Sequence, residues 1–342
     1  MKKFFLSWLS AQSSSFFGQV IGVIKGLWLL LLLFFAFATG VPAQEYPSRP
    51  IRMVVPSTSG ITSDTLARLL GPRLSKKWGV AVVVDNKAGA GGIIGAEAVA
   101  NAEPDGYTLL VANTSFGTLA AINPKLPYDP IKSFSSVSLL STSVMTLVVP
   151  EKMAASTVRE FVDLVKKQPG HLNYSSPGVG TTQHLAMELI KQRTGINMLH
   201  VPYKGSAGAL SDLIAGHVQA SVVALQTAAP YVDSKRIKMI AILGTQKATQ
   251  FPNVPLMSTA GFGDVVVETW SAVMAPAGTP ANVIAKLNME IDAQLFVPEV
   301  REAMTKQGVV PVGGRPERLD QWLRNEISLW SEVVARGKIS PN

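Results

Sequence analysis

Three stretches of the 342-residue chain combine small residues, hydroxyls and glycine directly ahead of a predicted helix. They are residues 56–64 (PSTSGITSD), 113–117 (NTSFG) and 175–182 (SSPGVGTT). The first turn of a helix leaves backbone N–H groups unpaired and carries a partial positive charge, which suits a carboxylate or a phosphate. Glycine lets the backbone approach such an anion, and hydroxyls add donors. Ordinary capping explains any one loop better, but three in one chain favour a shared anion site.

The other motifs give no sign of catalysis. Residues 89–95 (GAGGIIG) miss the spacing of a dinucleotide fingerprint, because Ile94 stands where the third glycine belongs, so we interpret them as a tight turn. No phosphate-binding loop, Gly-x-Ser-x-Gly motif or His-Glu-x-x-His motif is present. We expect His184 to bond the third loop from a helix start rather than to act as a base, and His184 with Glu188 makes a poor metal site. The sequence therefore predicts no catalytic residue, no cofactor and no metal.

Composition excludes several classes of protein. A hydrophobic fraction of 47% excludes a disordered chain, and the lack of cysteine excludes disulfides, thiolate metal sites and a cysteine nucleophile. The net charge is +8, and the basic residues form no run and are not interleaved with aromatic residues. We therefore expect no nucleic-acid partner, and instead a mild positive field that favours small anions.

The amino terminus has the features of an export signal. Residues 27–41 are uncharged and rich in Leu and Phe, Lys25 precedes them, and Val41-Pro42-Ala43 suits signal peptidase. The apolar run is short for a membrane span, which needs roughly 20 residues. We therefore predict that residues 1–43 are a cleaved signal peptide, with a retained anchor as the alternative.

The rest of the chain has the alternating pattern of an α/β fold. In its first half we predict strands at 51–55, 80–84 and 109–112, all buried, and helices at 64–74 and 92–101, with Gly71-Pro72 kinking or shortening the former. Two further strands, 137–140 and 146–149, cross into a second series.

The second series begins with a helix that Thr157 and Glu160 open as a capping box and Pro169-Gly170 stops. We predict strands at 172–175, 198–201, 218–224 and 238–243, then a helix capped by Thr279-Pro280, a helix that ends at Gly308 and a helix over 319–335. This order indicates two lobes around a cleft, divided as residues 44–145, 146–268 and 269–342, the last part returning to the first lobe.

Eight motifs in register resemble the Bug family, the extracytoplasmic solute-binding receptors of tripartite tricarboxylate transporters. They are residues 46–51 (YPSRPI), 54–56 (VVP), 84–86 (VDN) with 89–92 (GAGG), 104–109 (PDGYTL), 126–130 (LPYDP), 183–186 (QHLA), 200–205 (HVPYKG) and 276–280 (PAGTP). The resemblance covers essentially all of residues 46–339.

The resemblance implies a two-lobed periplasmic-binding-protein fold of type II-like architecture, with a carboxylate held in the cleft by backbone N–H groups, hydroxyls and water. It carries ligand contact onto Ser57, Thr58, Gly60, Thr62, Asp64, Ser176, Gly178, Gly180, Thr181 and His184, and more weakly onto Thr114 and Ser115.

The sequence departs from the family pattern at two places. Ser57 replaces an aromatic residue and Ile61 replaces a glycine in the first loop. At residues 224–226 (ALQ) the usual acidic residue is absent, although Gln226 keeps an amide near the expected cleft. These changes leave the general role intact but leave the identity of the carboxylate open.

We therefore predict a monomeric, non-enzymatic periplasmic receptor that captures a small organic carboxylate and delivers it to the membrane subunits of a transporter. Two alternatives stay open. One is a receptor that presents its ligand to a membrane sensor. The other is a secreted hydrolase that uses Ser176 or Thr181 with His184.

Overall fold

The computed structural model describes residues 45–263 and 265–340, so the predicted signal peptide, residues 1–43, lies outside the described residues. The chain from Arg49 onward forms one compact unit. Its elements are β1 (Ile51–Val55), α2 (Thr62–Trp78), β2 (Val82–Asn86), the short 3-10 turn η1 (Ala90–Gly92), α3 (Ile93–Ala100), β3 (Thr108–Asn113), α4 (Thr114–Ile122), β4 (Phe134–Pro150), α5 (Val158–Lys167), β5 (Asn173–Ser176), α6 (Thr182–Thr194), β6 (Leu199–Pro202), α7 (Ser206–Ala215), β7 (Ala220–Ala224), α8 (Leu225–Asp233), β8 (Ile237–Ile242), η2 (Ser258–Ala260), β9 (Glu268–Pro276), α9 (Ala281–Leu295), α10 (Pro298–Lys306), β10 (Val310–Pro311) and α11 (Pro316–Gly337).

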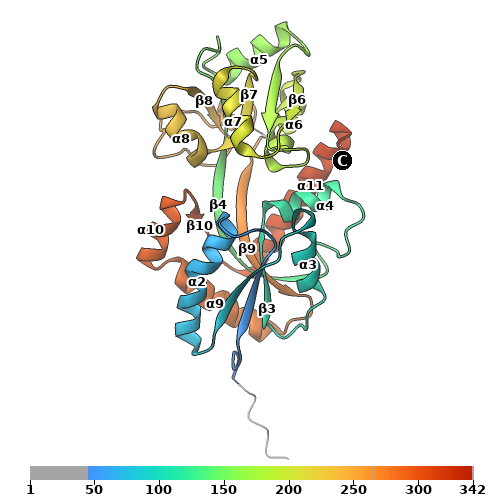
Figure 1. The fold of residues 1–342 in the computed structure, drawn as a ribbon, viewed down its shortest axis with the longest axis vertical. Coiled ribbons are helices and arrows are strands. Elements are labelled where there is room, and N and C mark those ends of the chain that lie inside the picture. The colour runs from blue at the N-terminus through green and yellow to red at the C-terminus, as the bar shows by residue number, and fades with distance from the viewer. Residues whose placement is uncertain (1–44, 264, 341–342) are drawn as a thin grey trace, which may run out of the picture. The chain divides into compact units, whose positions relative to one another are not determined.

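The strands form two groups, which we call the first and the second lobe. In the first lobe β1 pairs in parallel with β2 and β3, and β9 lies antiparallel between β3 and β4. In the second lobe β5 pairs in parallel with β6 and β7, while β7 and β8 pair antiparallel with the end of β4. This two-lobed α/β arrangement agrees with the sequence prediction (Figure 1).

Strands β4 and β9 connect the lobes. β4 pairs with β9 as far as Val144 and with β7 from Met145 onward, and β9 begins at Glu268 opposite Val144. The prediction of two separate strands in this region is wrong, because β4 is one strand of 17 residues. The Ser and Thr residues at its centre are typical of a turn. In the structure, however, they pair with β9 or β7, so their backbone N–H and C=O groups have partners and the strand continues.

Two other predictions in the first lobe are wrong: Gly71-Pro72 does not shorten the helix, and the second strand is not buried. Helix α2 runs through Pro72 to Trp78 without ending early; Leu66, Leu70 and Leu74 are fully buried along one face, and this packing outweighs the hydrogen bond that proline removes. Strand β2 is not buried. It begins two residues later than predicted, and among the described strands it pairs only with β1. Val83 is therefore 52% exposed at the edge of the sheet.

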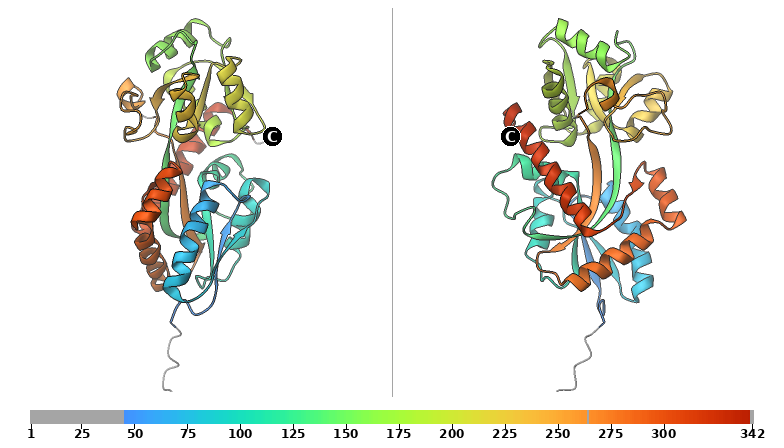
Figure 2. Two further views of the ribbon diagram at one scale, coloured as in Figure 1. Left: turned by 60° about the vertical axis from the view of Figure 1, so that its left-hand side comes forward. Right: turned by 180° about the vertical axis from the view of Figure 1, so that it is seen from behind.

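The remaining predicted elements are found within a few residues of their expected bounds, including the capping box of Thr157 and Glu160 at the start of α5. Helix α11 packs on both lobes: Leu319 and Leu323 join the core of the first lobe, and Trp330 and Val333 join that of the second. Figure 2 shows this helix running diagonally alongside β4 and β9 from the first lobe toward the second. None of the described helices has the combination of length and apolarity that crossing a membrane requires.

Candidate functional site

A cavity of about 560 Å³ lies between the two lobes. The first lobe contributes Ile61, Thr62, Ser63, Gly91, Asn113, Thr114, Ser115, Thr118, Leu119, Ser141, Thr269, Trp270, Ser271 and Val309. The second lobe contributes Pro177, Val179, Gly180, Thr181, Thr182, Gln183, Ser206 and Ala224. None of these described lining residues has a charged side chain, so the polar surface of the cavity consists of hydroxyls, amides and backbone groups.

The starts of several helices face this cavity. α2, α4 and α6 each place first-turn residues in its wall, as do α7 with Ser206 and α8 with its capping residue Ala224. The side chain of Asn113 caps α4, and that of Thr181 caps α6, but no side chain caps α2, α7 or α8. Their first N–H groups and the positive ends of the helix dipoles are therefore available to an anion in the cavity.

The structure places the sequence-predicted contact residues in two sets. Those that line the cavity are Thr62, Thr114, Ser115, Gly180 and Thr181. Those that do not line it are Ser57, Thr58, Gly60, Asp64, Ser176, Gly178, His184 and Gln226. Most of the residues that do not line the cavity instead make hydrogen bonds within the loops to which the lining residues belong.

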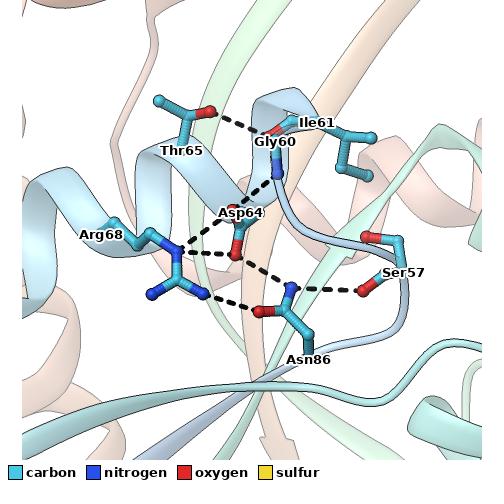
Figure 3. Close-up of polar contacts among 7 residues, drawn as sticks. All are labelled: Ser57, Gly60, Ile61, Asp64, Thr65, Arg68 and Asn86. Atoms are coloured by element: carbon cyan, nitrogen blue, oxygen red, sulfur yellow. Dashed lines mark hydrogen bonds and ion pairs between the residues drawn. The ribbon is translucent and has the colours of Figure 1, made fainter.

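In the first lobe, Asp64 braces the loop between β1 and α2. Its carboxylate accepts hydrogen bonds from the Gly60 N–H at 2.8 Å, from Arg68 Nε at 3.1 Å and from Asn86 Nδ2 at 2.9 Å. Asn86 also donates to the backbone oxygen of Ser57 and accepts from Arg68 (Figure 3). Because this charge is fully occupied inside the loop, Asp64 does not oppose an anion in the cavity directly.

The pKa of Asp64 reflects the same contacts. Burial by itself would raise the pKa of this carboxyl, but the hydrogen bonds from Gly60, Arg68 and Asn86 and the charge of Arg68 lower it below its ordinary value. The group is therefore ionised at neutral pH, and the loop is held by a charged network.

In the second lobe, the loop between β5 and α6 is held by neutral rings. His184 Nδ1 accepts a hydrogen bond from the Gly180 N–H at 3.1 Å, which fixes that nitrogen as unprotonated. The ring of His184 stacks on His200 with centroids 3.9 Å apart, and His200 stacks on Tyr174 in turn. His200 Nε2 lies 2.7 Å from the hydroxyl of Ser176, directly beneath the loop.

Burial lowers the pKa of both imidazoles. Desolvation is the largest cause for each; for His200 the neighbouring His184 adds to it, and the pKa falls to about 4. Both rings are therefore neutral at pH 7. The prediction that His184 bonds the loop from a helix start agrees with these contacts.

The arrangement required by the hydrolase alternative is not present in the described loops. The Ser176 hydroxyl is fully buried, faces His200 rather than His184, and does not reach the cavity. The Thr181 hydroxyl donates to the backbone oxygen of Gly178, and the nitrogen of His184 that would accept its proton is already bonded to Gly180.

Gln226 lies where the lobes are joined rather than in the cavity. Its Oε1 accepts a hydrogen bond from Ser143 Oγ of β4 at 3.1 Å, and the same hydroxyl lies 2.9 Å from the backbone oxygen of Gly308. A Cβ at Gly308 would overlap the Gln226 side chain, which would then have to move. The amide therefore joins α8 of the second lobe to β4 at Ser143, next to the segment between α10 and β10 of the first.

Sequence reasoning missed the part of the cavity wall that the connecting strands form. Ser141 of β4 and Thr269, Trp270 and Ser271 of β9 all line it. The signal was the unusual number of hydroxyls within otherwise apolar strands. A search confined to loops before helices does not detect it.

Comparison with known proteins identifies the family. The family model described as "Tripartite tricarboxylate transporter family receptor" matches residues 66–338. Protein BugT of Bordetella pertussis (strain Tohama I) is 36% identical over 299 residues, which is 87% of this chain and 92% of BugT.

Solved structures of the same kind share the fold. An R. palustris protein with adipate is 31% identical, with a TM-score of 0.72 over 87% of this chain and 100% of its own. MatC from Rhodopseudomonas palustris with bound malate is 32% identical, with a TM-score of 0.68 over 84% and 100%. The periplasmic binding protein BugD is 30% identical, with a TM-score of 0.69 over 87% and 100%. The predicted fold class and family are thus confirmed: this chain belongs to the receptor family of the tripartite tricarboxylate transporters.

Proposed function

We propose that this protein is a non-enzymatic periplasmic receptor that captures a small organic carboxylate and delivers it to the membrane subunits of its transporter. The observation that carries the proposal is the uncharged cavity on which helix starts from both lobes converge. Neutral donors bind a carboxylate strongly where water is excluded, and five helix starts supply partial positive charge. The one carboxylate in these first turns, that of Asp64 in α2, is paired with Arg68.

The contact residues that we propose are those of the predicted set that line the cavity. Thr62, Thr114 and Ser115 would hold one end of the ligand from the first lobe, and Gly180 and Thr181 would hold the other from the second. The two solved relatives with adipate and malate support a dicarboxylate as the ligand. We propose that it places one carboxylate at each lobe. A cavity of about 560 Å³ leaves room for bridging waters beside such a ligand.

Closure of the lobes would complete the site. We propose the lobe boundaries at residues 145 and 268, since β4 changes its pairing partner from β9 to β7 at Met145 and β9 begins at Glu268. Within the described residues the chain passes between the lobes at these two places, and α11 packs on both lobes. Rotation about these strands would bring Gly180 and Thr181 toward the helix starts of the first lobe. The closed form would be the one that the membrane subunits recognise, after removal of residues 1–43.

A thermal-shift panel tests the proposal. Purified protein, unfolded and refolded to remove any carried-over ligand, is heated with adipate, malate and other mono-, di- and tricarboxylates, each paired with its uncharged amide. A true ligand at 100 times its Kd stabilises the fold by about 2.7 kcal/mol, which raises Tm by several degrees. We expect at least one acid to do so while its amide does not. Equal shifts for acids and amides, or none across the panel, would contradict the proposal.

A further inference from the structure

One buried carboxyl lies behind the cavity wall and takes no part in the contacts described so far. Glu326 of α11 is 9% exposed. Its Oε2 accepts a hydrogen bond from Trp270 Nε1 at 2.5 Å, and its Oε1 accepts one from Trp330 Nε1 at 3.2 Å. On the α4 side it packs against Gly117, where any side chain would overlap the carboxyl. The carboxyl thus occupies a space that the surrounding residues leave for it.

The two indoles connect Glu326 to both lobes. Trp270 is part of the cavity wall, and its backbone N–H donates to the Thr114 hydroxyl at 2.8 Å, next to the start of α4. Trp330 is part of the core of the second lobe. Glu326 therefore fixes the indole of a cavity residue to the helix that joins the lobes.

No cation balances this carboxyl within the described part of the chain. The elements α4 and β4, which pack on α11, carry no charged residue. The charged residues of the other neighbours have different partners or face solvent: Glu268 on β9, Glu188, Lys191 and Arg193 on α6, and Arg324 and Glu332 on α11. His184 of α6 is neutral and bonded to Gly180.

Burial raises the pKa of Glu326 to about 8, although the bonds from Trp330 and Trp270 oppose the rise. The carboxyl is therefore protonated at pH 7 and becomes charged in mild alkali. A carboxylate ligand and an ionised Glu326 would both lie against Trp270, in a region of low dielectric, and would repel each other.

We propose that Glu326 is a positioning residue for the ligand cavity that couples anion binding to its own protonation. It holds the Trp270 indole in the cavity wall, and it takes up a proton from solvent, at a carboxylate oxygen, when an anion binds to the ionised form. This inference rests on the proposed capture of a carboxylate.

The test is the pH dependence of ligand affinity. Isothermal titration with adipate and malate is carried out between pH 6.5 and 9.0, where both acids stay fully ionised. His184 and His200, whose pKa values are lowered, and Tyr174 and Tyr203, whose pKa values are raised, titrate outside this range. We expect the Kd of the unmodified protein to rise through pH 8, by about tenfold for each unit by which the ligand raises the pKa of Glu326.

Two variants show whether Glu326 is responsible. Glu326→Gln mimics the protonated acid, so its Kd should not change across this range. Glu290→Gln is the matched control, because Glu290 of α9 is also 9% exposed but the Trp270 indole donates to Glu326, and the Kd of this variant should follow that of the unmodified protein. A flat profile in the unmodified protein, or the same slope in Glu326→Gln, would overturn the inference while leaving the proposed function intact.

If no acid binds, the proposed function itself is contradicted and the Kd cannot be measured. The inference about Glu326 is then tested by the pH dependence of Tm without ligand. Because the pKa of Glu326 is raised on folding, the folded state holds the extra proton and its stability falls as pH rises toward about 8. Tm measured from pH 6 to 9 should therefore fall more in the unmodified protein and in Glu290→Gln than in Glu326→Gln. Equal slopes would overturn the inference here too.

Discussion

The loop before α2 in the first lobe and the loop before α6 in the second both carry a helix start to the cavity, but different interactions hold them. Around Asp64 the first loop is held by a charged network, which includes the half-exposed Arg68. The second is held by the stacked, neutral rings of His184 and His200, which are largely buried. In both loops the side chains with titratable groups support the backbone, while glycine, threonine and serine face the cavity. The same anion-binding geometry can therefore be built without placing a charge in the site.

The largest effect is expected at Gly180, which lines the cavity at φ +77°. A Cβ there would lie 2.8 Å from Ile122 Cδ1, so Gly180→Ala should displace the loop and weaken carboxylate binding at least about tenfold, or about 1.4 kcal/mol. Gly195→Ala is the control, because Gly195 has φ +70° at the end of α6 but nothing within 4 Å. Titration calorimetry should show a loss in the first variant alone. Equal binding by both would mean that the second loop does not contact ligand.

Removal of the His184 ring should be the next largest effect. His184→Leu leaves the Gly180 N–H without an acceptor and should cost about 1–3 kcal/mol of unfolding free energy, measured by urea denaturation. His184→Asn can place an amide oxygen near the position of Nδ1 and should recover part of the loss. If the two variants are equally destabilised, the hydrogen bond to Gly180 is not what the imidazole contributes.

The contributions of the two loops to stability should be lost at different pH values. The pKa values of His184 and His200 are lowered on folding, so the unfolded chain binds protons more readily and stability falls as pH drops below about 6.5. The pKa of Asp64 is also lowered on folding. A lowered carboxyl pKa stabilises the fold above about pH 3.9, and this contribution is lost only at lower pH. Glu326 opposes the fall caused by the two histidines over the same range, because its raised pKa stabilises the fold as pH drops toward the ordinary value of a carboxyl, so the measurement is made in the Glu326→Gln background. Tm should fall there by a few degrees between pH 6.5 and 4.5. His200→Asn should reduce that fall, whereas Asp64→Asn should leave it unchanged.

The smallest effect is expected in the first loop at neutral pH. The Arg68 side chain is 52% exposed, so Arg68→Gln should change the unfolding free energy by less than about 1 kcal/mol. Asp64→Asn should cost more, since it also disturbs the bonds from Gly60 and Asn86. A loss at Arg68 as large as that of His184→Leu would remove the distinction between the two loops.

The sequence allowed the two-lobed fold and the three loops to be predicted, because apolar periodicity and glycine or hydroxyl residues before helices are local signals. It did not show which loop residues face the cavity and which form hydrogen bonds that hold the loop backbone in place. Asp64, Ser176 and His184 stand within or just after the loops, and only the fold shows that they turn inward toward Asn86, His200 and Gly180. The cavity residues of β4 and β9 depend on a pairing across more than a hundred positions, which no local pattern contains.

The central claim is that an uncharged cavity captures a carboxylate with helix starts from both lobes. The most direct test is a crystal structure with the acid that gives the largest thermal shift. We expect its carboxylate oxygens within hydrogen-bonding distance of backbone N–H groups or hydroxyls at the starts of α2, α4 and α6, directly or through one water. We expect no Lys or Arg side chain in contact with them. An ion pair to such a side chain, or an acid bound outside this cavity, would contradict the account.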